Sequence, residues 1–142
     1  IEVNPEDMTT PEEARRFIEE TGVDRLAIVF GNIHGVSLAG NPRLDINRLK
    51  AIHEAIPDMP LTLHGGSGII DEDIRATLPH GMSNIHVNTE IRVAYTNALR
   101  TRFADDPDET TPYKYADTAI EAAQNIVEGK LRLFGAVNLL NY

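Results

Sequence analysis

The chain has no cysteine, no long hydrophobic run and an excess of acidic over basic residues, and each feature excludes a class of protein. Without cysteine there are no disulfide bonds, which fits a cytoplasmic protein. No apolar stretch approaches the roughly 18 residues of a membrane-spanning helix, and the first residues show no basic-then-apolar secretion signal. The formal net charge of −9 argues against nucleic acid as a partner, because that binding needs a positive surface. We therefore expect a cytoplasmic protein that binds neither membranes nor nucleic acid.

What is present is the composition of a soluble globular protein. Of the 142 residues, 42% are apolar and 25% are charged. A chain of this length can bury a sizeable core as one domain. We find no linker and no low-complexity segment. The sequence therefore predicts one domain over residues 1–142, with no internal boundary.

Helical and extended patterns alternate along the chain. Strands that alternate with helices of this length predict right-handed βαβ units and a parallel sheet, which is an α/β fold. The expected elements, helix and strand in turn with two helices at the end, are residues 10–22, 25–30, 46–56, 61–64, 71–81, 84–88, 89–103 and 112–129.

Local signals support several of these elements. Thr10, Pro11 and Glu13 carry the signature of a helix N-terminus, with a capping residue, a proline at the first position and an acid three residues after the cap. The run 25–30 is almost continuously apolar, as expected of a parallel strand covered on both faces. Thr89 is expected to cap the helix that follows it.

The last helix carries apolar residues at helical spacing. We expect it to bury one face, made of Ala116, Ile120, Ala123 and Val127.

Two of the expected strands end in the same way, in a histidine followed by glycine. The first leads into GNIHG at residues 31–35, and the second ends in HGGSG at residues 64–68. Because the carboxyl ends of parallel strands meet at one edge of a sheet, we expect His34 and His64 to lie side by side. Neutral imidazoles there suit zinc, which prefers nitrogen ligands and keeps an open position in catalytic sites. The alternative is that each histidine hydrogen-bonds a neighbouring loop.

The glycines of HGGSG also allow an anion site. They permit a turn whose backbone N–H groups face an anion, and the helix that follows directs the positive end of its dipole to the same place. The alternative is that the glycines serve tight-turn geometry alone.

Three segments, in this order and spacing, carry a resemblance to a known family. They are GNIHGV from residue 31, PLTLHGGSGI from residue 60 and NIHVNTEIRVA from residue 84. Together they resemble the class II, zinc-dependent fructose-bisphosphate aldolases, a family that includes the tagatose-bisphosphate aldolases. The resemblance runs from about Thr10 to Phe134, onto the C-terminal half of the family's barrel.

The resemblance implies both a fold and an activity. A complete (β/α)₈ barrel typically takes about 250 residues, and three strands cannot close one. The strands would be about numbers six to eight of a TIM barrel, so the chain would be its C-terminal portion. The family reaction is the reversible cleavage of fructose 1,6-bisphosphate to dihydroxyacetone phosphate and glyceraldehyde 3-phosphate. Zinc acts there as a Lewis acid on the ketone, and His34 and His64 match two zinc ligands of the family.

The resemblance also implies a phosphate site, which barrels of this kind usually build from the loops after strands seven and eight. Two positions depart from the family. Ser37-Leu38 stands where a Tyr-Lys pair is usual, which removes a cation, and a histidine stands where the family has an asparagine that touches substrate. The residues implied in binding substrate or phosphate are Gly35, Gly65, Gly66, Ser67, His86, Asn88 and Thr89.

One family motif is missing. The third zinc ligand and the general acid/base of the family belong to a His-x-Asp-His motif of the first half, and this sequence has no such motif. We therefore expect the chain alone to be catalytically inactive.

The expected partners follow from the same resemblance. They are a phosphorylated sugar (a ketose bisphosphate or dihydroxyacetone phosphate) and either the missing barrel half or further copies in a homo-oligomer, which would cover the open sheet edges. Two alternatives stay open, namely a tagatose-bisphosphate aldolase and a non-catalytic phosphate-binding or assembly protein built on the same barrel half.

Overall fold

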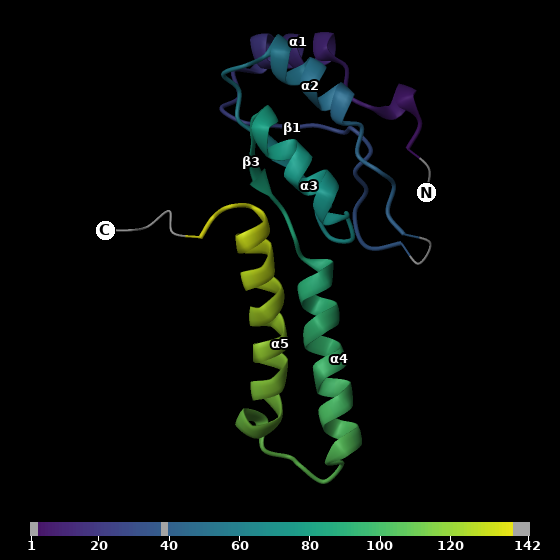
Figure 1. The fold of residues 1–142 in the computed structure, drawn as a ribbon, viewed down its shortest axis with the longest axis vertical. Helices are drawn as coiled ribbons and strands as arrows, with labels where there is room; N and C mark the ends of the chain where they lie inside the picture. Colours follow the sequence, from purple (N-terminus) through teal and green to yellow (C-terminus); the bar gives the residue numbers. More distant parts are fainter. Residues whose placement is uncertain (1–2, 38–39, 138–142) are drawn as a thin grey trace, which may run out of the picture. The chain divides into compact units, whose positions relative to one another are not determined.

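The computed structural model describes residues 3–37 and 40–137 of the chain (Figure 1). Its contacts group into two compact units, Ile1–Val87 and Asn88–Tyr142. The predicted single domain without an internal boundary stays a prediction, because a grouping of contacts does not establish how many parts fold independently. Every helix in the described part of the chain is too short or too polar to cross a bilayer.

The first unit is an α/β arrangement around a parallel sheet, as the alternating pattern predicts. The sheet has three strands in the order β1-β2-β3, and both pairs are parallel. Two short 3₁₀ turns, Pro5–Asp7 and Leu78–His80, complete the unit. The helices and strands in chain order are α1 (Pro11–Thr21), β1 (Leu26–Ala27), α2 (Ile46–Ala55), β2 (Leu61–Leu63), α3 (Asp71–Thr77) and β3 (Met82–Ile85).

The first strand is much shorter than the apolar run 25–30 that predicts it. Its regular pairing ends at Ala27, which lies opposite Thr62 of β2. Beyond that point Val29 bonds to Thr9, since its N–H donates to the Thr9 Oγ1 atom at 3.0 Å and its carbonyl accepts the Thr9 N–H at 2.8 Å. The Phe30 N–H donates to a side chain in the next loop. The residues stay apolar, but their backbone groups find partners outside the ladder.

The third strand also differs from its expected range, since it begins two residues earlier than residues 84–88 and ends at Ile85. Main-chain bonds nevertheless continue past its end. The His86 N–H donates to the Leu63 carbonyl at 2.9 Å, and the Gly66 N–H donates to the His86 carbonyl at 2.9 Å. The ends of β2 and β3 are therefore fastened to each other by backbone bonds.

Burial separates the central strand from the edge strand. All three residues of β2 are buried. Along the first apolar run, Leu26, Ile28 and Phe30 are buried while Ala27 is exposed and Val29 is 38% exposed. The expectation that this run is covered on both faces is therefore wrong within this chain, because an edge strand of an open sheet has fewer neighbours than the central strand.

The predicted N-terminus of α1 is confirmed. Thr10 Oγ1 accepts the Glu13 N–H at 3.2 Å, and the Glu13 carboxylate accepts the Thr10 N–H at 2.9 Å. This reciprocal pair satisfies two N–H groups that the helix itself leaves without partners. Gly22 ends α1 in the left-handed conformation, at a φ of 66°.

A buried acid fastens the loop between β1 and α2 to the start of α3. Asp73 is 3% exposed, and its carboxylate accepts hydrogen bonds from Arg43 Nε at 2.9 Å and Arg43 Nη2 at 2.7 Å. The Leu44 N–H donates to the same carboxylate at 3.0 Å. The Arg43 guanidinium holds the pKa of the Asp73 carboxyl below its ordinary value of 3.8, and the Leu44 N–H acts in the same direction.

The second unit is a helical hairpin of α4 (Thr89–Asp105) and α5 (Pro112–Leu133), which pack side by side (Figure 1). Asn88 holds the N-cap position expected of Thr89, which is instead the first helical residue. Glu90 near the start of α4 pairs with Lys130 of α5 at 2.8 Å. This ion pair joins the two helices at the end where α4 begins.

The predicted buried face of α5 is correct only in part, because Ala116 and Ala123 are half-buried while the other two residues are exposed. The helix continues to Leu133 rather than ending near Gly129, and its buried residue is Ala119. Ile120 is 56% exposed and Val127 is 40% exposed. The helix carries apolar residues over a wide arc, and the hydrophobic pattern alone does not indicate which part of that arc meets α4.

We predict that Asp73→Asn lowers the free energy of unfolding by about 2 kcal/mol at pH 7, because it removes charge-assisted hydrogen bonds from a buried position. The folded-state pKa is depressed, so this stabilisation is present above the unfolded-state pKa of about 3.9 and is lost as the pH falls through the lower folded value. Urea unfolding of wild type and variant, followed by circular dichroism at several pH values, measures the difference.

The matched control is Asp71→Asn, an exposed acid on the same helix whose ion pair with Arg75 spans 3.7 Å. It should change stability little at any pH. A deficit in Asp73→Asn that stays the same size from pH 7 down to pH 2 would show that the carboxylate charge is not what stabilises the loop.

Candidate functional site

The structure brings His34 and His64 together at the end of the sheet where its parallel strands finish. His64 directly follows β2, and His34 lies in the loop after β1, seven residues beyond Ala27. Their ring centroids are 5.7 Å apart and their planes differ by 26°. His34 is exposed and His64 is half-buried. The juxtaposition is the one that parallel pairing predicts, and the role of the two imidazoles as zinc ligands stays a prediction.

A third histidine, His86, lies at the same edge, one residue beyond β3. Its ring meets that of His64 edge-on, with centroids 4.3 Å apart and an interplanar angle of 64°. The Nε2 atom of His86 lies 3.1 Å from the Asn84 side-chain nitrogen. This contact brings the Asn84 amide and the His86 ring within hydrogen-bond distance of each other.

His86 Nε2 therefore already has a hydrogen-bonding neighbour in Asn84. Within residues 3–37 and 40–137, no group of three or more His, Cys, Asp or Glu side chains has an arrangement that could hold a metal ion. The chain presents a pair of candidate ligands, His34 and His64, with His86 as a neighbour that contacts His64 and Asn84.

The glycines allow the three strand ends to approach one another closely. Gly65 has a φ of 72°, and a Cβ atom there would overlap the Ile33 carbonyl oxygen. A Cβ atom on Gly66 would lie 2.9 Å from the His86 carbonyl oxygen. The N–H of Gly66 already donates to that carbonyl, so it is not a donor for an anion in this arrangement. At Gly65 and Gly66 the structure shows the close packing that requires glycine.

The other predicted phosphate residues differ in their placement. Gly35 has a φ of 92°, and nothing lies within 4 Å of the position of a Cβ atom. Ser67 is 2% exposed, so its side chain belongs to the interior of the turn. Asn88 and Thr89 begin the helical hairpin, a separate unit, so their part in a phosphate site stays a prediction.

Sequence reasoning missed two asparagines that connect the histidine loops. Asn32 donates from its side-chain amide to the His64 carbonyl at 3.1 Å. Asn41 donates to the Gly35 carbonyl at 3.0 Å and to the Ser67 carbonyl at 2.8 Å. Asparagines are frequent in loops as turn residues, and nothing in the sequence distinguishes a bridging amide from a local one.

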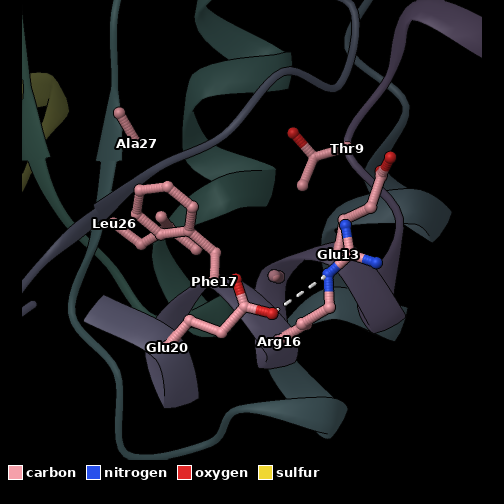
Figure 2. Close-up of a pocket in the computed structure, with 8 residues that line it drawn as sticks. Thr9, Glu13, Arg16, Phe17, Glu20, Leu26 and Ala27 are labelled. Atoms are coloured by element: carbon pink, nitrogen blue, oxygen red, sulfur yellow. Dashed lines mark ion pairs between the residues drawn. The ribbon is translucent and has the colours of Figure 1, made fainter. Parts of the chain in front are cut away.

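A separate groove of about 330 Å³ lies beside β1, away from the predicted site residues. It is lined by residues of α1, by Thr9 and by Leu26 and Ala27 of β1 (Figure 2). An ion pair between Arg16 and Glu20, at 3.8 Å, lies among the lining side chains. None of the residues predicted to bind metal or phosphate lines this groove.

Comparison with known proteins gives the family. The chain matches the family model of class II fructose-bisphosphate aldolase over residues 1–139. It also resembles the crystal structure of the YdjI aldolase from Escherichia coli K12, with 31% identity and a TM-score of 0.76, over 92% of this chain and 47% of that one. The fructose-bisphosphate aldolase of Campylobacter jejuni has the same fold, with 21% identity and a TM-score of 0.78, over 92% of this chain and 46% of that one.

The chain thus spans less than half the length of these two aldolases. The family match covers nearly all of it and confirms the resemblance carried by the three sequence segments. The chain belongs to the class II fructose-bisphosphate aldolase family.

Proposed function

We propose that this chain is the C-terminal portion, strands six to eight, of a zinc-dependent ketose-bisphosphate aldolase barrel. The observation that carries the proposal is the 5.7 Å separation of the His34 and His64 rings at the carboxyl edge of a parallel sheet. Active sites of such barrels lie at this edge. The family match and the likeness to two solved aldolases support the reaction class.

The reaction is the reversible cleavage of fructose 1,6-bisphosphate to dihydroxyacetone phosphate and glyceraldehyde 3-phosphate. His34 and His64 would hold the zinc ion, since their imidazoles supply nitrogen donors at neighbouring strand ends. Zinc, when bound, supplies a Lewis acid for the carbonyl of the substrate. The turn at residues 64–68 would contribute to binding the phosphate, whose binding energy orients the reacting carbons. The part of Asn88-Thr89 in phosphate binding is proposed on the family resemblance alone.

The proposal assigns the remaining chemistry to residues outside this chain. The sequence lacks the His-x-Asp-His motif that supplies the third zinc ligand and the general acid/base in the family. The other barrel half would bring them, whereas a further copy in an oligomer would cover the open sheet edges but lacks the same motif. The cytoplasm is the proposed location, since the chain has no cysteine.

One departure from the family favours a second candidate substrate or a lost activity. His86 occupies the position of an asparagine that touches substrate in the family, and its Nε2 atom is engaged by Asn84. The second departure, Ser37-Leu38, falls partly outside the described residues because Leu38 is not among them. A tagatose-bisphosphate aldolase is therefore the second candidate, and a non-catalytic phosphate-binding or assembly protein is the third.

We predict that the chain binds zinc and that His34→Ala and His64→Ala each weaken binding at least tenfold, because each removes one of two nitrogen donors. Tenfold corresponds to about 1.4 kcal/mol. Titration of zinc against a competing chelator at pH 7.5 measures the affinity.

The matched control is His80→Ala, since His80 lies in the 3₁₀ turn before β3, at the opposite end of the sheet. Its affinity for zinc should equal that of wild type. If His34→Ala and His64→Ala bind zinc as wild type does, the assignment of the two ligands is wrong.

We further predict that the 142-residue chain, with or without added zinc, cleaves neither fructose 1,6-bisphosphate nor tagatose 1,6-bisphosphate, because the general acid/base lies outside it. A coupled assay for the triose phosphates measures cleavage, and a complete class II aldolase serves as the positive control. Measurable turnover of either sugar, abolished by His64→Ala, would show that this chain carries its own acid/base.

A further inference from the structure

The loop that carries His34 is fastened to the turn after β2 by the side chain of Asn41. The Asn41 amide nitrogen donates to the Gly35 carbonyl at 3.0 Å and to the Ser67 carbonyl at 2.8 Å. Its Oδ1 atom accepts the Ser37 N–H at 2.8 Å. One amide thus bonds to backbone groups on both sides of the gap between the two loops.

The Asn41 side chain packs tightly against the turn after β2. A Cβ atom on Gly68 would lie 2.9 Å from the Asn41 amide nitrogen, and Gly68 itself has a φ of 81°. Glycine therefore lets the amide reach the Ser67 carbonyl. The next residues of the loop are fastened too, because Arg43 and Leu44 bond to the buried Asp73 carboxylate.

A second asparagine, Asn32, acts at the start of the same loop. Its Oδ1 atom accepts the Phe30 N–H at 3.0 Å, and its amide nitrogen donates to the His64 carbonyl at 3.1 Å. It joins the end of the first apolar run to the backbone of the second histidine.

The His34–His64 pair and the His64–His86 pair are held in place by different kinds of hydrogen bond. The ends of β2 and β3, which carry His64 and His86, are joined by main-chain hydrogen bonds at Leu63 and Gly66. The regular pairing of β1 with β2 ends at Ala27, seven residues before His34. Across that interval, side-chain amides rather than a strand ladder connect the two loops.

We propose that Asn41, with Asn32 in support, is a positioning residue that sets the separation of the His34 and His64 imidazoles. The proposal rests on the proposed function in one respect, namely that these two imidazoles are the zinc ligands. Asn41 hydrogen-bonds neither ring and acts through the carbonyls of Gly35 and Ser67. Gly35 directly follows His34, and Ser67 is the third residue after His64.

Two substitutions separate this role from general stability. Asn41→Asp keeps an acceptor for the Ser37 N–H but replaces the donating amide with a carboxylate oxygen, which faces two carbonyl oxygens. Asn41→Ala removes all three side-chain hydrogen bonds without adding a charge. The matched control is Asn47→Asp, the same change at an exposed position of α2 in the same unit.

The decisive measurement is proton NMR of the 142-residue chain, in which nuclear Overhauser contacts between imidazole ring protons report the two histidine pairs separately. In Asn41→Asp and Asn41→Ala, the His34–His64 contact should be lost while the His64–His86 contact is kept, because the latter pair is held by main-chain bonds. Asn47→Asp should keep both. Zinc affinity, measured by chelator competition, should fall at least fivefold in the two Asn41 variants only.

The outcomes divide cleanly. If both ring contacts persist in the Asn41 variants, or if both are lost together, Asn41 does not selectively position His34 and the proposal is overturned. If the His34–His64 contact is lost but zinc affinity is unchanged, the positioning has no bearing on metal binding, which also overturns it. If wild type binds no zinc at all, the proposed function fails, and the ring contacts still decide whether Asn41 sets the geometry.

Discussion

The parallel pairing of β2 with both of its neighbours is the constraint on which the rest of the first unit depends. Leu61 lies opposite Leu26 on one side and Met82 on the other, so all three strands run the same way. The residues that follow the three strands therefore lie at the same end of the sheet, beyond the carboxyl ends of the strands. Three histidines emerge there, with ring centroids 5.7 Å and 4.3 Å apart in the two neighbouring pairs.

Close approach at that edge is possible because the turn after β2 begins with glycines. A side chain at Gly65 or Gly66 would collide with a carbonyl oxygen of a neighbouring loop. From the sequence, the same glycines are interpreted as a turn whose N–H groups face an anion. The structure shows that they are also needed for close packing against the neighbouring loops. In the turn after β2 the N–H of Gly66 serves the sheet, whereas Gly35, in the loop after β1, has no neighbour within 4 Å of a Cβ position.

The outer strand of the sheet is left partly uncovered, as expected of a chain that matches only part of the two solved aldolases. The chain spans less than half of the two solved aldolases to which it was compared. At the outer edge of the sheet, Ala27 is exposed, and a groove of about 330 Å³ runs beside it (Figure 2). Open edges of this kind accept further strands, which supports the proposal that a partner completes the barrel.

Local signals in the sequence were reliable where the interacting residues are close in the chain. The capping pair of Thr10 and Glu13 formed as predicted, three residues apart. Prediction failed where the partner is distant or its position is not set by a pattern. The apolar run 25–30 forms only a two-residue strand because Thr9 and Asn32 take its backbone groups, and α5 buries Ala119 rather than Ile120 because of where α4 lies.

The sequence by itself determined the α/β order, the parallel sheet and the repeated His-Gly ends, since alternating patterns and chain direction suffice for these. It also carried the family, through three segments whose spacing matches. Only the tertiary structure decided how the two histidine loops are joined, because Asn41 is six residues from Gly35 in the sequence but 26 from Ser67. A hydrogen bond from a side chain to a distant backbone carbonyl leaves no periodic trace in the sequence and exists only once the sheet has brought the loops together.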